Sequence, residues 1–223
     1  MGNINFLKDK YEFQLNRMAA FSDGVFAIAI TLLVLEIQIP DIDKKGLTDK
    51  DLLIQFGQQL PTLISFVVSF FVIGLYWMAH HRLLKYVTSI NHKLVWNNLL
   101  FLFPIVIMPF STKLFSRFYY SETLRIPFAV YALTICLCGI LSFNLWKVIT
   151  NPKNKLTTLT DKRVIDYNSM RILIIPISFA ITFLLSFVTV WAYLIPPFIP
   201  LTTRIVSRYY LKKYPYLKEV QES

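Results

Sequence analysis

Long, nearly unbroken apolar runs occupy much of the 223-residue chain and restrict what it can fold into. A soluble domain would space its apolar residues at the period of a helix or strand and leave polar faces toward water. A helix needs about 20 apolar residues to cross the hydrocarbon core of a bilayer. Because 55% of the residues are hydrophobic and they group in such runs, the sequence predicts an integral membrane protein made of helices.

We predict an all-α membrane protein with six transmembrane helices per subunit. Their approximate bounds are Ala19–Ile39, Ile54–Ala79, Leu94–Phe110, Ile126–Val148, Ile172–Val190 and Trp191–Val206. The sixth is short, and the proline-rich residues 195–200 either form a turn or break a helix. This divides the chain into a cytoplasmic N-terminus (1–18), a six-helix transmembrane domain (19–211) and a basic cytoplasmic tail (212–223).

The positions of lysine and arginine predict how these helices are oriented. Cytoplasmic loops of membrane proteins carry an excess of both residues. Here the excess lies in the N-terminus, in the loops after the second and fourth spans, and in the C-terminal tail. Both termini are therefore expected in the cytoplasm. The same placement accounts for most of the net charge of +10, so we do not expect nucleic acid as a partner.

The first span begins with polar residues that are unusual at the edge of a membrane. Arg17, Phe21, Ser22 and Asp23 stand at its cytoplasmic entrance. A carboxylate in a membrane segment is costly unless it is paired or hydrated. Part of that cost is offset at a helix N-terminus, where the helix dipole favours an anion. Ser22 or Asp23 can therefore simply cap the helix, and this alternative stays open.

An apolar stripe follows these polar residues along the same helix. Ile28, Leu32 and Leu35 are spaced at i, i+4 and i+7, and Thr31 lies beside them. Such a stripe is typical of a packing seam. If several subunits place it on a shared axis, it forms stacked apolar rings, which gate ions by dewetting when they are narrow. Glu36 would then add negative charge near the outer mouth.

The run RMAAFSD at Arg17–Asp23, followed by GVFAIAITLLVLEI, resembles the signature of the transmembrane protein 175 family. That family comprises potassium channels of endosomes and lysosomes and their bacterial counterparts. The run YWMAHHR at Tyr76–Arg82, at the end of the second span, is similar to the family as well. Six helices in a chain of this length resemble the bacterial form, whose location would be the plasma membrane.

The resemblance implies a homotetramer in the lipid bilayer, with the first helix of each subunit lining a central pore. It implies that Ile28, Leu32 and Leu35 form the constriction and that Thr31 contributes to a preference for potassium. The carbonyl filter sequence TVGYG of ordinary potassium channels does not occur in the chain. We expect no cofactor, no catalytic residue and no metal other than permeating potassium ions.

A second group of polar residues lies at the cytoplasmic end of the second span. The predicted topology puts Trp77, His80 and His81 on the same side of the membrane as Arg17 and Asp23. Within one subunit or between two, Arg17 can pair with Asp23, and His80 or His81 can hydrogen-bond to the motif. Such a network would hold the first helix in place. Proton sensing by a histidine is the alternative. Adjacent histidines diverge by about 100° on a helix, so a shared metal ion is not expected.

Three functions are compatible with such a chain. A potassium-permeable cation channel is the first. A proton-coupled secondary transporter would need an ionisable residue near the midplane of the membrane. The middles of the predicted spans contain no Asp, Glu, Lys or Arg. A membrane hydrolase would need a nucleophile with a base beside it, yet no GxSxG or HExxH pattern occurs. The sequence therefore favours the channel.

Overall fold

The computed structural model describes residues 2–37, 48–119, 124–189 and 198–216, and these form helices and short connections. The elements in chain order are α1 (Gly2–Val34), α2 (Asp49–Gln58), α3 (Leu60–Leu84), α4 (His92–Arg117), α5 (Ile126–Thr150), the 3-10 turn η1 (Pro152–Asn154), α6 (Lys162–Leu185) and α7 (Ile199–Lys213).

Five of these helices are long and apolar enough to cross a membrane: α1 from Tyr11 onward, α3, α4, α5 and α6. They coincide with the first five predicted spans. The sixth predicted span, Trp191–Val206, begins outside the described residues. Its second half lies in α7, which has 15 residues and continues to Lys213. Pro196 and Pro197 also fall outside the described residues, whereas Pro200 lies in the first turn of α7.

The helices α1 and α6 extend beyond the apolar runs of the sequence. α1 already begins at Gly2, so most of the predicted N-terminal segment 1–18 is helical. The second predicted span divides at Gln59 into α2 and α3. α2 starts at a capping box, in which Asp51 N–H donates to Thr48 Oγ1 at 3.3 Å and Thr48 N–H donates to Asp51 Oδ2 at 3.1 Å. The hydrogen bonds from Thr48 hold the pKa of Asp51 below its ordinary value.

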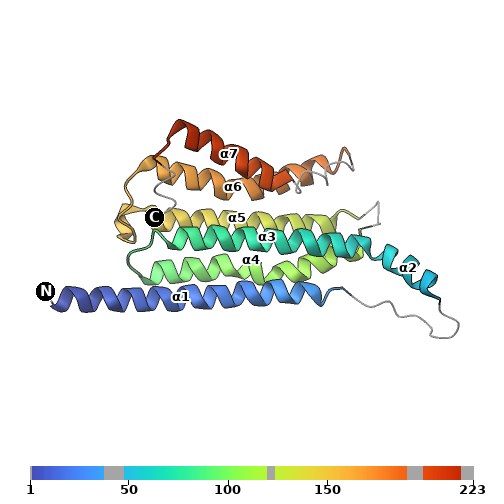
Figure 1. Ribbon diagram of the computed structural model, residues 1–223, viewed down its shortest axis with the longest axis horizontal. Helices are drawn as coiled ribbons and strands as arrows, with labels where there is room; N and C mark the ends of the chain where they lie inside the picture. Colours follow the sequence, from blue (N-terminus) through green and yellow to red (C-terminus); the bar gives the residue numbers. More distant parts are fainter. Residues whose placement is uncertain (1, 38–47, 120–123, 190–197, 217–223) are drawn as a thin grey trace.

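The long helices form an antiparallel bundle (Figure 1). α1 packs against α3 and α4, α5 packs against α4 and α6, and α7 covers α6 on the side far from α1. The start of α1, the α3–α4 connection, η1 and the end of α7 lie at one end of the bundle, and α2 lies at the other. The four basic segments thus share one end, as the sequence predicts.

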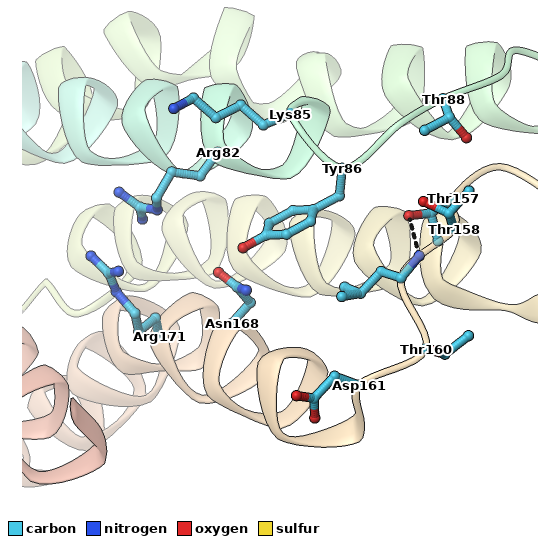
Figure 2. A pocket seen from close by; sticks show the side chains of 11 residues that line it. Arg82, Lys85, Tyr86, Thr88, Thr157, Thr158, Thr160, Asp161, Asn168 and Arg171 are labelled. Carbon is cyan, nitrogen blue, oxygen red and sulfur yellow. Dashed lines mark hydrogen bonds between the residues drawn. The ribbon is translucent and has the colours of Figure 1, made fainter. Parts of the chain in front are cut away.

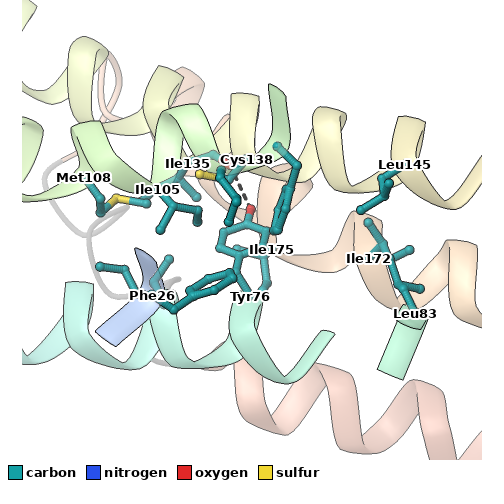
Figure 3. Close-up of a cluster of buried hydrophobic side chains, with 14 of the residues drawn as sticks. Phe26, Tyr76, Leu83, Ile105, Met108, Ile135, Cys138, Leu145, Ile172 and Ile175 are labelled. Carbon is teal, nitrogen blue, oxygen red and sulfur yellow. Dashed lines mark hydrogen bonds between the residues drawn. The ribbon is translucent and has the colours of Figure 1, made fainter. Parts of the chain in front are cut away.

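One apolar core joins the five long helices. Phe26, Tyr76, Ile105, Cys138 and Ile175 come from α1, α3, α4, α5 and α6 respectively, and all are buried in it (Figure 3). Close packing matters more in lipid than in water, because lipid is as apolar as the core and provides no hydrophobic force between helices.

Buried hydrogen bonds add direct links between the helices. Tyr76 Oη donates to the Ile135 carbonyl at 2.8 Å and ties α3 to α5. Ser69 Oγ on α3 lies 2.9 Å from Tyr131 Oη on α5 and accepts from Thr112 Oγ1 of α4 at 2.8 Å. Interhelical hydrogen bonds of this kind stabilise membrane bundles by about 0.6 kcal/mol each on average. The helices α3, α4 and α5 are therefore joined by buried hydrogen bonds, and α1 packs against α3 and α4.

Candidate functional site

One face of α1 is fixed against the bundle. Met18, Ser22, Phe26, Ala29 and Leu33 are buried, with at most 8% of each exposed. Their spacing of three or four residues is that of a single helix face. The buried face is the one that holds α1 on α3 and α4, and the opposite face is exposed in the part of the chain that the structure describes.

The opposite face carries the four predicted constriction residues. Ile28, Leu32 and Leu35 are 61%, 40% and 69% exposed, and Thr31 is exposed as well. The Thr31 hydroxyl donates to the Ile28 carbonyl at 2.9 Å, so its oxygen lone pairs remain free to face a ligand. A single described chain therefore presents an apolar stripe with one hydroxyl, available to lipid, to a neighbouring subunit or to a shared axis.

A chain of three buried hydrogen-bonding side chains anchors the start of the α1 span. Asn98 on α4 donates from Nδ2 to Ser22 Oγ at 2.9 Å, and Ser22 Oγ donates to the Met18 carbonyl at 2.9 Å. His80 Nε2 on α3 lies 2.7 Å from Asn98 Oδ1. Because the Asn98 nitrogen is used on Ser22, its oxygen accepts, so His80 is the donor. Asn98 thus connects α1, α3 and α4.

His80 is also enclosed by aromatic rings. It is 1% exposed, stacks on Phe101 at 5.3 Å between centroids, and lies 5.8 Å from the ring of Phe26. His81 differs, because it is exposed and its ring lies 6.1 Å from that of Trp77. Of the two adjacent histidines, only His80 belongs to the network, and no metal-binding group of three ligands occurs among the described residues.

Asp23 has a partner that the sequence did not predict. Trp77 Nε1 on α3 donates to Asp23 Oδ1 at 2.8 Å. Arg17 does not reach Asp23 within the described chain; its guanidinium lies 5.8 Å from the ring of Phe13. Phe21 is 55% exposed and lines a cavity of about 840 Å³ that Arg17 also borders. Within one subunit the indole therefore bonds to the carboxylate in place of the guanidinium, and a pairing of Arg17 with Asp23 between two subunits stays a prediction.

Glu36, predicted at the outer mouth, forms an ion pair. Lys113 Nζ of α4 lies 2.8 Å from Glu36 Oε2, at the end of the bundle opposite the termini. The negative charge that the sequence places there is thus offset by a lysine 77 positions later in the chain.

Asn98 is the residue whose importance the sequence did not reveal. Asn97 and Asn98 both open the third predicted span, and the sequence alone assigns a role to neither. The structure separates them, because Asn98 is buried whereas Asn97 accepts from the exposed Asn144 at 2.7 Å. A polar residue within an apolar run is the one signal that pointed to it.

Removing the Asp23 carboxylate is expected to destabilise the protein more than it changes ion preference. Asp23→Ala leaves the Trp77 indole without its acceptor and costs about 1 kcal/mol, since both groups are partly in contact with solvent. Asp23→Asn is the matched control, because it removes the charge but keeps an oxygen that can accept from the indole. Thermal unfolding and a native gel measure the effect. A stable, normally assembled Asp23→Ala protein with altered permeation would contradict it.

The fold and this site define an integral membrane helical bundle whose first helix is anchored on one face and bare on the other. A family model described as the endosomal/lysosomal potassium channel TMEM175 matches residues 17–109. A potassium channel of Chamaesiphon minutus is 33% identical over 181 residues, 80% of this chain and 87% of that protein. A potassium channel of Streptomyces collinus is 32% identical over 174 residues, 78% and 82% of the two chains.

A solved structure agrees with these sequence relatives. The crystal structure of a lysosomal potassium-selective channel TMEM175 homolog from Chamaesiphon minutus superposes with a TM-score of 0.70 at 29% identity, covering 85% of this chain and 98% of that one. The TMEM175 protein of Bos taurus, named an endosomal/lysosomal proton channel, is 32% identical over 58% of this chain and 28% of its own length. This chain belongs to the TMEM175 family, whose members are ion channels and not enzymes.

Proposed function

We propose that the protein is a subunit of a homotetrameric potassium channel of the plasma membrane that conducts passively. The first helix of each subunit lines the pore, and the rings of Ile28, Leu32 and Leu35 constrict it. Narrow apolar rings oppose ion passage because an ion must shed its water there, so they suit a gate or a constriction. No cofactor takes part, and the permeating ion is the only ligand of the pore.

The observation that supports this proposal most strongly is the asymmetry of α1. Its buried face is held by hydrogen bonds as well as by packing, whereas the stripe is bare along its length. A stripe that served only to contact lipid would need no such precise anchoring. A pore lining does, because an error in the rotation of α1 would replace the rings with other side chains.

Two polar residues lie along the proposed pore, one between the rings and one beyond them. Thr31 lies between two of the rings and keeps oxygen lone pairs free for a dehydrated cation. Glu36 stands beyond Leu35 at the outer mouth, where its pairing with Lys113 weakens the attraction of cations. We therefore propose a pore whose ion preference depends on Thr31 more than on Glu36.

The proposed orientation places the basic end of the bundle and both termini in the cytoplasm. It requires an even number of membrane crossings, so a sixth crossing is part of the proposal. At that end the Ser22–Asn98–His80 network acts as a scaffold for α1, together with the Asp23–Trp77 hydrogen bond. The burial of His80 among aromatic rings favours this structural role over proton sensing.

A proton-coupled transporter is the alternative. It would need an ionisable group deep in the membrane, and the middles of the spans predicted from the sequence hold no Asp, Glu, Lys or Arg. The name of the animal relatives favours a different possibility, that protons also pass through the pore. Proton flux is therefore measured alongside potassium and sodium flux.

Widening one of the proposed rings is expected to increase ion flux several-fold. Leu35→Ala shortens one apolar side chain in each of the four subunits of a tetrameric pore. The wider ring lowers the free-energy barrier that dewetting imposes on an ion. Purified protein in liposomes is assayed under a potassium, a sodium and then a proton gradient. The matched control is Leu133→Ala, because Leu133 on α5 is 67% exposed but lies on another helix.

Potassium flux that changes in Leu35→Ala and stays unchanged in Leu133→Ala supports the proposed pore. Equal currents in all three proteins would remove Leu35 from the conduction path. Potassium movement that requires a proton gradient would favour the transporter.

A further inference from the structure

A basic cavity of about 780 Å³, whose lining is drawn in Figure 2, opens at the end of the bundle where α1 begins and α3 ends (Figure 1). Its walls are the end of α3, the connection after it, the segment 157–161 and the first turns of α6. α6 lies on the side of α5 that faces away from α1 (Figure 1), so this cavity is separate from the proposed pore.

Cations dominate the lining of this basic cavity. Arg82 and Lys85 enter it from α3 and its C-terminal end, and Arg171 enters it from α6. The two guanidinium groups point toward one another (Figure 2). Among the described residues neither forms an ion pair with a carboxylate. Two like charges that face each other without an acid between them repel, so an anion bound between them would be stabilised.

The acid that lines the basic cavity is used elsewhere. Asp161 lines the basic cavity, but its Oδ2 accepts from Tyr216 Oη at 2.8 Å and its Oδ1 accepts from the Arg163 N–H at 2.8 Å. These two hydrogen bonds lower the pKa of Asp161 and keep it ionised where it caps α6. Asp161 therefore does not supply the counter-charge of the arginine pair.

Hydrogen-bond donors without a partner in the described chain lie at the basic cavity and at a smaller cavity beside it. Arg171 donates from Nη1 to Tyr167 Oη at 3.2 Å, while its buried Nε has no hydrogen-bond partner in the described chain. Both arginines also border an adjoining cavity of about 170 Å³, where the buried Ser142 Oγ is likewise unpartnered. Buried donors left without acceptors are costly, and a buried guanidinium especially so. An acceptor-rich ligand would satisfy them.

We propose that Arg82, Arg171 and Lys85 form a binding site for a phosphate group at this end of the protein. The planar fork of an arginine matches two phosphate oxygens, and a lysine adds a point charge. The hydroxyl of Thr158, which also lines the cavity, supplies a further donor. Because α3 ends and α6 begins here, the site lies where the headgroup of an anionic phospholipid or a soluble phosphate can enter.

The test compares two variants that each lose two positive charges. Arg82→Gln/Arg171→Gln removes the pair from the basic cavity. Arg204→Gln/Arg208→Gln is the matched control, since both residues are exposed on α7 and neither lines this cavity. Each full-length protein is placed in phosphatidylcholine nanodiscs and its binding of radiolabelled inorganic phosphate is measured. Native mass spectrometry then measures how much phosphatidylglycerol each retains from mixed vesicles.

We expect binding to the cavity variant to be weaker by roughly tenfold or more, and binding to the control to match the wild type. A selective loss of phosphate binding identifies a soluble ligand, and a selective loss of retained phosphatidylglycerol identifies a headgroup. Equal behaviour of the two double variants in both assays overturns the proposal, because net charge alone would then explain any loss.

A third variant distinguishes a loss of binding from a loss of folding. Lys85→Gln changes an exposed residue just beyond α3 and leaves the packed arginines in place, so it should weaken binding by a few-fold with an unchanged unfolding temperature. Unaltered phosphate and lipid binding in this variant, together with a cavity variant that no longer folds, would also count against the site. The ion flux of the wild type is measured separately, so its absence would concern the channel and not this site.

Discussion

Asn98→Leu is expected to cause the largest loss of stability of any single substitution in the anchor of α1. Leucine has the same number and branching of side-chain heavy atoms as asparagine but offers neither a donor nor an acceptor. His80 Nε2, which lies 2.7 Å from the Asn98 amide, would lose its partner while buried. Ser22 Oγ would lose the donor at 2.9 Å but would still donate to the Met18 carbonyl. A stranded buried group costs about 1–3 kcal/mol, so the free energy of unfolding falls by roughly 2–4 kcal/mol once the smaller loss at Ser22 is added.

Thermal unfolding in detergent, followed by intrinsic fluorescence, measures this loss. Asn144→Leu is the matched control, since the Asn144 amide bonds to Asn97 at an exposed position on α5. Similar unfolding temperatures for the two variants would contradict the role given to Asn98. A double-mutant cycle with His80→Phe sharpens the test, because removing both partners should cost less than the sum of the single changes.

Gly139→Ala is expected to have the second largest effect, at the contact between α5 and α6. A Cβ at position 139 would lie 2.6 Å from Cβ and 2.8 Å from Cδ of Pro176, and closer still to its Cγ. The proline ring cannot rotate away, and it sits inside α6, so one helix must shift. Overpacking of this kind typically costs about 1–3 kcal/mol, and here it would also loosen the neighbouring Cys136–Pro176 contact.

The unfolding temperature of Gly139→Ala should therefore fall, whereas that of Gly74→Ala should not. Gly74 is the matched control because it also lies within a membrane-spanning helix, and an added methyl group there meets nothing within 4 Å. An alanine at 139 that leaves stability unchanged would mean that the α5–α6 contact is not as close as described. Small residues at helix contacts let backbones approach, which is why a glycine faces the proline.

Much of the architecture could be predicted from the order of residues alone. The first five apolar runs, about 17 to 26 residues each, were each long enough for a membrane helix, and all five lie on observed helices. The basic segments alternated along the chain and do gather at one end of the bundle. The motif Arg17–Asp23 indicated the family, because its spacing is a local property of one helix. The ends of helices were less predictable, since polar residues continue α1 and α6 beyond the apolar runs.

Contacts between segments that are distant in the sequence could be identified only from the tertiary structure. The sequence suggested Arg17 as a partner of Asp23 and did not suggest Trp77, and the packing of α1 on α3 brings the indole to the carboxylate. It could not single out Asn98 from Asn97, because only the rotation of α4 buries one of them. Hydropathy and motif spacing are properties of short segments and can be read directly, whereas the partner of a buried polar group depends on how helices from different parts of the chain pack together.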